Sequence, residues 1–345
     1  MKFPIAVFCH SIGWQNKHLR IDFTEDYFLN SEYRICADMK YQRKLFELFS
    51  EIGLGKENPQ PRPHIDCCGG ILGKAIFGIP TTFNKDSPPD TFPMNINEQA
   101  MREFRLVPDF AERFPMKNIR IQVEQMQKQY GRVEPTYDLY HHGVVNLGLE
   151  IRGEEMMMDI VTKPQDLKDF LNRLGDGIMT VAEYTNTLMG KPPLYKLGHC
   201  SMCMFSPDFY RQFVMDIDVK LARKLRPFGI HHHGRTDNAH LDAYKELENR
   251  SRIPIEFFDL DWNVDVRYFR NLFPHAHLFY IMKYDFLADS NYAAFCQEIE
   301  GLLKRNNGNK TITFIAGDLD DGISKSNILS FAKAIHTVAG RNDFA

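Results

Sequence analysis

Short apolar runs of strand length recur along the chain, and most are followed by a longer segment with helical periodicity. The apolar runs cover residues 64–68, 138–142, 194–197, 228–232, 255–260, 277–282 and 311–316. Apolar residues three and four positions apart mark predicted helices over residues 97–104, 116–130, 164–189, 207–225, 237–249, 264–272, 292–304 and 326–339. Alternation of this kind predicts a parallel sheet whose strands are joined by helices.

The pattern favours a single α/β domain over residues 1–345, with a (β/α)8 TIM barrel over residues 64–340. Seven strands are visible, and the eighth is expected near residues 78–83, where Pro80 and two threonines interrupt the apolar pattern. Residues 22–54 read as helix, ended by a polar, proline-rich run. Residues 1–63 are therefore expected to form an N-terminal helical extension.

The rival architecture is a doubly wound open sheet. Such a sheet usually carries a Gly-rich phosphate loop after its first strand, and the chain has neither G-x-G-x-x-G nor a Walker sequence. No change of composition and no Gly/Ser-rich linker divides the chain. One barrel domain is the simpler interpretation.

Charge and cysteine content argue against several classes of protein. A formal net charge of −3 without a sustained Lys/Arg stripe gives no attraction to nucleic acid or anionic lipid. The apolar stretch within residues 1–8 is too short for a signal peptide or a membrane span. Seven scattered cysteines do not resemble a disulfide framework. We therefore expect reduced thiols and a cytoplasmic protein.

Polar side chains follow the predicted strands, where a barrel places its active site. They are His64, Asp66, His141, His142, His199, Cys200, Cys203, His231, His232, His233, Asp259, Asp261, Lys283, Asp285, Asp318, Asp320 and Asp321. Imidazole and thiol groups bind transition metals at neutral pH, so their convergence on one rim would form a metal site. The alternative for any single histidine is a half-buried residue hydrogen-bonded to a neighbouring loop.

Three consecutive histidines before Gly234 are the sharpest local feature. Along an extended strand end, His231 and His233 point to the same side and His232 points away. Two ligands at that spacing can share one metal, with a third supplied by Asp318 or by Cys200. The alternative is a surface histidine cluster with no metal.

Cys200 and Cys203 form the only C-x2-C pair of the chain. A structural zinc of the four-cysteine kind needs two such pairs, and a redox catalyst needs a thioredoxin-like unit. We therefore expect packing cysteines here, or one metal ligand. The following Ser206-Pro207 predicts a helix start, with Ser206 as the cap and Pro207 at the first position.

Five segments, taken in order, resemble the uroporphyrinogen decarboxylase superfamily, which includes the haem-pathway decarboxylases and the cobalamin-linked methyltransferases. They are residues 142–145 (His-Gly-Val-Val) with 151–154 (Ile-Arg-Gly-Glu), 204–210 (Met-Phe-Ser-Pro-Asp-Phe-Tyr), 229–234 (Gly-Ile-His-His-His-Gly), 260–265 (Leu-Asp-Trp-Asn-Val-Asp) and 322–328. The resemblance runs over residues 65–339. It implies the (β/α)8 barrel with its site at the strand ends.

The chain is more similar to the methyltransferases than to the decarboxylases. The Arg-rich N-terminal motif and the strand-end Asp with which the decarboxylases bind an acidic tetrapyrrole are missing. The methyltransferases hold zinc through H-x-C-G after one barrel strand and a Cys after the last. Here His231-x-His233-Gly234 matches the first motif with His in place of Cys, and Gly317-Asp318 stands in place of the second. The resemblance implies zinc held by His231, His233 and Asp318, with Cys200 as the alternative ligand.

On this resemblance we expect a metal-dependent methyl or one-carbon transferase with a small-molecule substrate. A corrinoid would be carried by a separate partner protein, because the chain has no D-x-H-x-x-G cobalamin loop. His199, Asp259 and Asp285 would orient the acceptor. The alternatives are a decarboxylase or lyase of the uroporphyrinogen decarboxylase type acting on a smaller acid, and a non-catalytic binding protein. Homodimers are common among family members.

Overall fold

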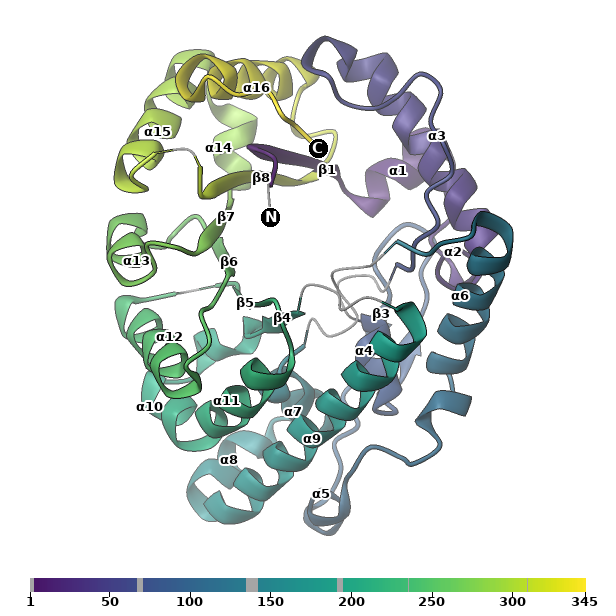
Figure 1. Cartoon of the computed structure of the whole chain (residues 1–345), viewed down its shortest axis with the longest axis vertical. Coiled ribbons are helices and arrows are strands. Elements are labelled where there is room, and N and C mark those ends of the chain that lie inside the picture. The colour runs from purple at the N-terminus through teal and green to yellow at the C-terminus, as the bar shows by residue number, and fades with distance from the viewer. Residues whose placement is uncertain (1–2, 67–70, 135–141, 191–194, 235, 309) are drawn as a thin grey trace.

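A sheet of six parallel strands organises the chain. The computed structural model describes residues 3–66, 71–134, 142–190, 195–234, 236–308 and 310–345. The strands lie in the order β1-β8-β7-β6-β5-β4, and Figure 1 shows them along the inner side of an arc of helices. Their bounds are Ala6–His10 (β1), Tyr195–Gly198 (β4), Phe228–His232 (β5), Phe257–Asp261 (β6), His277–Ile281 (β7) and Ile312–Leu319 (β8).

The register of the strands gives the sheet two chemically different faces. Gly198 on β4 pairs with His231 on β5, and His231 pairs with Asp259 on β6. The outward face is mostly apolar and packs against the helices, with Ile230, Phe258, Leu260, Leu278 and Phe314 almost fully buried. The inward face of β4, β5 and β6 carries polar groups, among them Lys196, which lies 3.1 Å from Asp259.

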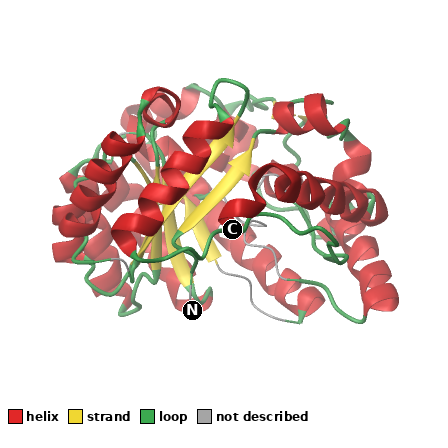
Figure 2. Cartoon of the chain, turned by 90° about the horizontal axis from the view of Figure 1, so that it is seen from above, coloured by secondary structure: helices red, strands yellow, loops and turns green. Residues whose placement is uncertain are grey.

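The helices flank these strands, as Figure 2 shows from above. The α-helices are Ile12–Leu19 (α1), Glu25–Leu29 (α2), Ser31–Phe49 (α3), Ile71–Ile76 (α4), Glu98–Glu103 (α5), Met116–Tyr130 (α6), Val144–Arg152 (α7), Glu155–Thr162 (α8), Pro164–Met189 (α9), Pro207–Phe209 (α10), Met215–Lys224 (α11), Asn238–Ser251 (α12), Val266–Leu272 (α13), Tyr284–Asp289 (α14), Tyr292–Arg305 (α15) and Lys325–Ala339 (α16). Shorter turns are η1 (Ser50–Ile52), η2 (Phe110–Glu112), η3 (Cys200–Met204) and the π-helical η4 (Tyr210–Val214).

Side-chain caps fix where several helices begin. A capping oxygen accepts a hydrogen bond from a backbone N–H of the first turn at Ser11, Asn30, Asn97, Asp237, Asp265, Asn291 and Ser324. Ser206 does the same for Phe209, and Pro207 occupies the first helical position, so the predicted helix start is confirmed. That helix continues from α10 through η4 into α11.

The predicted helices are confirmed closely, because their apolar periodicity and their caps agree. The predictions over residues 116–130 and 164–189 coincide with α6 and α9, and the last five predicted helices begin and end within two residues of the observed ones. The helical segment 22–54 divides at Asn30 into α2 and α3.

Five of the predicted strands are confirmed as β4 to β8. The predicted strand 138–142 lies outside the described residues except for His142. Of the predicted strand 64–68, the structure describes residues 64–66, and His64 forms a parallel β-bridge with Glu134. The eighth strand was wrongly placed at residues 78–83, because Thr81–Thr82 (β2) pairs antiparallel with Asp90–Thr91 (β3) in a separate hairpin.

The first strand lies in the segment that was expected to be an extension. β1 pairs in parallel with β8, so residues 1–63 contribute to the main sheet as well as to helices. This strand is short and follows Pro4, and the apolar rhythm that identifies the others begins only later. The described residues show an α/β fold with a six-stranded parallel sheet. Within these ranges, no helix is both long enough and apolar enough to cross a membrane.

Candidate metal centre

Three side chains with metal-binding donor atoms converge beyond the carboxyl ends of β4 and β5. Cys200 opens η3 directly after β4, His231 lies in β5, and His233 follows that strand. One donor atom from each lies within 4.8 Å of the other two. The pairing of Gly198 with His231 brings the two strand ends together. Since side chains two residues apart share a face of a strand, both imidazoles lie on the inward side.

A carboxylate from the next strand orients the first histidine. Asp259 Oδ2 lies 2.7 Å from His231 Nδ1, and Lys196 Nζ donates to the same oxygen at 3.1 Å. Burial alone would raise the pKa of Asp259, but Lys196, His231 and His233 hold it well below its usual range. The ionised carboxylate therefore accepts the Nδ1 proton of His231 and leaves Nε2 as the donor atom, as in carboxylate–histidine–metal groups.

The cysteine is held by neighbours that donate to its sulfur. Burial raises the pKa of the Cys200 thiol, while hydrogen bonds from the His233 backbone amide and the Asn146 side chain oppose that shift. Asn146 on α7 also accepts from the Ser201 amide at 3.1 Å, and its Nδ2 lies 3.2 Å from His142 Nδ1. Asn146 therefore fixes the turn that presents the thiol.

Burial favours the neutral form of two imidazoles at this centre, those of His231 and His142. Burial lowers the pKa of His231 to about 4, although the carboxylate of Asp259 opposes the shift. Burial lowers the pKa of His142 to about 3, with smaller contributions from Lys74 and His231. Neutral imidazole is the form that coordinates a metal.

The donor set fits zinc. One thiolate and two imidazoles with one open position match a catalytic zinc site, where bond lengths of about 2.0 to 2.3 Å put tetrahedral donors about 3.3 to 3.6 Å apart. The donor atoms lie within 4.8 Å of one another, and small side-chain rotations would bring them into this range. His233 Nε2 is buried and makes no hydrogen bond with any described residue, although Asp259 Oδ1 is 3.9 Å away. A bound metal would satisfy such a nitrogen.

The structure brings the alternative ligand Cys200, and not Asp318, to the two histidines. Asp318 is exposed near the end of β8, and β6 and β7 separate that strand from β5. It is absent from the group of donors that lie close enough to share an ion. The sequence analysis preferred Asp318 to Cys200 only through the resemblance, because Gly317-Asp318 stands where the similar methyltransferases have their second cysteine.

The three residues expected to orient an acceptor occupy different environments. Asp259 lies beneath the metal group, as described above. His199 is almost fully buried, with Nε2 3.1 Å from Asp218 on α11, so it faces the helical layer. Asp285 is exposed in the first turn of α14, 3.2 Å from Lys283. His141, another strand-end histidine, lies outside the described residues.

Two residues of the centre escaped the sequence analysis. Lys196 stands in the middle of β4 and Asn146 on α7, so neither follows a predicted strand. A period-two reading of β4 would have placed Lys196 on the same face as Gly198, and the family-like segment 142–145 ends next to Asn146. Neither signal indicates a contact with the histidines.

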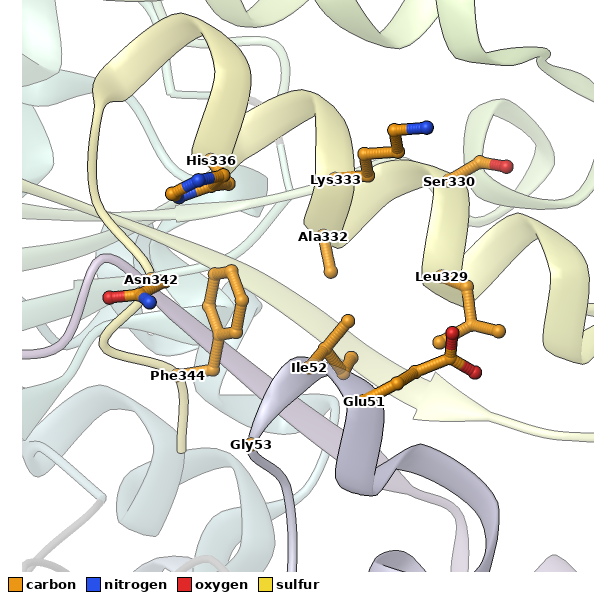
Figure 3. Close-up of a pocket in the computed structure, with 10 residues that line it drawn as sticks. All are labelled: Glu51, Ile52, Gly53, Leu329, Ser330, Ala332, Lys333, His336, Asn342 and Phe344. Atoms are coloured by element: carbon orange, nitrogen blue, oxygen red, sulfur yellow. The ribbon is translucent and has the colours of Figure 1, made fainter.

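A separate hollow of about 470 Å³ lies among η1, α16 and the C-terminal residues. Figure 3 shows Glu51, Lys333 and His336 around it, projecting from two different elements. It contains none of the residues of the metal centre.

Comparison with solved structures shows a similar fold in a methyltransferase from Methanosarcina mazei. The TM-score is 0.66, and the match covers 96% of this chain and 93% of that chain at 14% sequence identity. No family model and no curated protein matches this chain. At this identity, the likeness concerns the fold.

Proposed function

We propose that the protein is a metal-dependent transferase of methyl or other one-carbon groups, with zinc held by Cys200, His231 and His233. The observation that carries the proposal is the convergence of one thiol and two imidazoles at the carboxyl ends of adjacent strands, where α/β folds place their active sites. The methyltransferase with a similar fold supports the choice of reaction, as does the resemblance of the sequence to cobalamin-linked methyltransferases.

The chain's own residues would prepare this centre. Asp259 keeps the proton of His231 on Nδ1, and Asn146 and the His233 amide direct the sulfur of Cys200. Zinc bound there would act as a Lewis acid that lowers the pKa of an acceptor's thiol or hydroxyl group. One thiolate leaves one charge of the ion uncompensated, so the open position favours an anionic acceptor.

A corrinoid carried by a partner protein is the proposed methyl donor, and the acceptor is a small molecule. On the inward face of the sheet, Lys196, Phe279, Ile281 and Ile315 are only half-buried and Cys9 is exposed, so these side chains are partly accessible to an approaching molecule. The resemblance to cobalamin-linked enzymes supplies the identity of the donor, and the chain has no corrinoid-binding loop motif of its own.

Metal content tests the site. Untagged protein purified without chelator should contain one equivalent of zinc, while Cys200→Ala and His233→Ala should lose most of it. Cys203→Ala is the matched control, because it removes an exposed thiol three residues away and should keep the metal. Equal zinc in all four proteins would refute these ligands, and no zinc in any of them would refute the metal-dependent function.

Methyl transfer is tested separately. Zinc-loaded protein should demethylate free methyl-cobalamin in the presence of one member of a panel of thiols and alcohols, with the change in the corrinoid absorption spectrum as the readout. His233→Ala should abolish the reaction. Zinc binding without turnover of any acceptor would leave a metal-binding protein and overturn the proposed reaction.

A further inference from the structure

Cys200 and Cys203 form a dithiol in one short turn of the structure. Both belong to η3, a 3-10 helix. Such a helix has three residues per turn and rises about 2.0 Å per residue, so residues three apart are eclipsed and lie about 6 Å apart. This spacing lies within the range of about 4.4 to 6.8 Å that a disulfide requires between Cα atoms.

The second cysteine is held against the first and against the loop after β5. Cys203 Sγ donates to the carbonyl oxygen of Cys200 at 3.2 Å. A Cβ atom at Gly234, which has φ +87°, would lie 3.0 Å from both Cβ and Sγ of Cys203. Glycine at that position therefore leaves room for the Cys203 thiol. Asp261 accepts from the Gly234 amide and fixes the same loop from β6.

The two thiols differ in access. Cys203 is exposed, whereas Cys200 is partly buried among Asn146 and the His233 amide. An external reagent therefore reaches Cys203 first, and Cys200 is the neighbour within reach of a sulfur already modified there. An exposed thiol beside a second, less accessible one is the arrangement of an oxidisable pair.

We infer that Cys200 and Cys203 are a redox modification site, whose reactant is a low-molecular-weight disulfide. The Cys203 thiolate attacks one sulfur of the reagent, forms a mixed disulfide and releases one thiolate. The Cys200 thiolate then attacks the Cys203 sulfur, forms the Cys200–Cys203 disulfide and releases the second thiolate. The protein loses two electrons and two protons, and the reagent becomes two thiols. Here the chain is the reactant, so a thioredoxin-like catalytic unit is not needed.

The disulfide and the metal exclude each other. A sulfur engaged in a disulfide is no longer the thiolate that coordinates zinc, so oxidation removes one of the three proposed ligands and leaves His231 and His233. This coupling rests on the proposed function, whereas formation of the disulfide rests only on the geometry of η3. The metal site would therefore be filled under reducing conditions and emptied under oxidising ones.

The disulfide is tested on the full-length, metal-free protein. Oxidised glutathione is added at several ratios to reduced glutathione, free thiols are blocked by alkylation, and the peptide that contains both cysteines is examined by mass spectrometry. The expected product is the internal disulfide, and Cys203→Ser should leave Cys200 free to alkylate. Cys36→Ser, at an exposed position on α3, is the control and should form the disulfide as the unchanged protein does. Only a mixed disulfide at Cys203, or no reaction, would overturn the inference.

Zinc tests the coupling. With free zinc at 100 times its dissociation constant, half-oxidation should require about 100-fold more oxidant, because only the reduced form binds the metal. Oxidation of zinc-loaded protein should release one zinc per disulfide, followed with a zinc-sensitive dye. Zinc that binds but does not shift the oxidation would overturn the coupling. A disulfide that forms in a protein unable to bind zinc would instead refute the proposed function while the modification site stands.

Discussion

The two faces of β5 carry the same residue type in different chemical settings. His231 faces inward, where Asp259 on the neighbouring strand accepts from its ring at 2.7 Å. His232 faces outward, where the Tyr244 hydroxyl on α12 lies 2.7 Å from its Nδ1. Burial does not distinguish them, since the exposed fractions are 4% and 0%. The hydrogen-bond partner distinguishes them. The carboxylate of Asp259 directs the His231 ring towards the other metal-binding donors, and the phenol of Tyr244 holds the His232 ring in the helical layer.

His199 belongs to the outward setting. Its Nε2 lies 3.1 Å from Asp218 Oδ2, and the same oxygen accepts a hydrogen bond from the Tyr210 hydroxyl at 2.9 Å. Both Asp218 and Tyr210 are buried. Tyr210 opens the π-helical turn η4, and Asp218 lies on α11, which follows η4 directly. The difference between the faces teaches that strand-end histidines have to be sorted by face before they are assigned to a site. Outward ones stabilise the packing of helices on the sheet.

The largest effect is expected from Asp218→Ala. Removal of this carboxylate leaves the Tyr210 hydroxyl and the His199 ring buried without their partner, which should lower the free energy of unfolding by about 3 kcal/mol. Urea unfolding measures the loss. Tyr210→Phe, which removes a single hydrogen bond, should cost about 1 kcal/mol.

Zinc binding by Asp218→Ala tests whether the two faces of the sheet are independent. If His199, Tyr210 and Asp218 only stabilise the fold, folded Asp218→Ala should bind zinc as tightly as the unchanged protein. A loss of binding free energy larger than the loss of unfolding free energy would show that the two faces act as one site.

Asp259→Asn should have the second-largest effect, and on the metal more than on the fold. An amide in place of the carboxylate no longer fixes the Nδ1 proton of His231, and removal of such a partner typically weakens metal binding by about 10- to 100-fold. Competition with a chelator of known affinity gives the dissociation constant. Asp261→Asn, altered on the same strand but in contact with the Gly234 amide, is the matched control. An equal loss in both variants would show that the charge of β6 matters and the orientation of His231 does not.

His277 adds a third case to the comparison of the histidines on the sheet. It faces inward like His231, but its partner is a hydroxyl group and not a carboxylate. Its Nε2 lies 2.8 Å from Thr313 Oγ1, and burial, followed by Arg270 and Arg341, lowers its pKa from 6.5 to about 4. As the pH falls below 6.5, the unfolded chain binds a proton that the folded chain refuses. Stability present above pH 6.5 is therefore lost between pH 6.5 and 4.

The measurement is urea unfolding at two pH values. Between pH 7 and pH 5, the unchanged protein should lose about 2 kcal/mol more stability than His277→Gln, which has no group that titrates there. Equal losses in the two proteins would mean that the pKa of His277 is the same in the folded and the unfolded chain, which would refute the effect of burial on this residue.

The sequence predicted most of the longer helices and five strands, because apolar periodicity and caps are local properties, but it missed α1, α4, α7, α8 and α14. α6 and α9 were placed to the residue. β1 was not found, because five residues with a polar end carry too little pattern, and only pairing with β8 identifies the strand. The eighth strand was placed wrongly because the sequence pattern does not show with which strand a segment pairs, and Thr81–Thr82 pairs locally with β3.

The candidate site was predictable only in part. The two-residue spacing of His231 and His233 fixes their common face, which any strand would impose. The choice between Cys200 and Asp318 depends on which side chains meet in space. Gly198, two residues before Cys200, pairs with His231, whereas β6 and β7 lie between β5 and β8, and this pairing is a tertiary property. Lys196 and Asn146 reach the centre from the middle of a strand and from a helix, so a search of strand ends misses both.

The smallest effect is expected from Asp318→Asn. This exposed residue has φ +51°, and asparagine tolerates that left-handed conformation while lacking the charge, so the backbone of β8 should not change. If the metal is held on the β4 and β5 side of the sheet, the zinc dissociation constant should change by less than about twofold, the limit of an exposed charge at a distance. His233→Ala, measured by the same chelator competition, sets the scale for a true ligand. A comparable loss of zinc affinity in Asp318→Asn would show that Asp318 on β8 is a metal ligand. It would also mean that metal binding brings β8 and β5 closer together than they are in this structure.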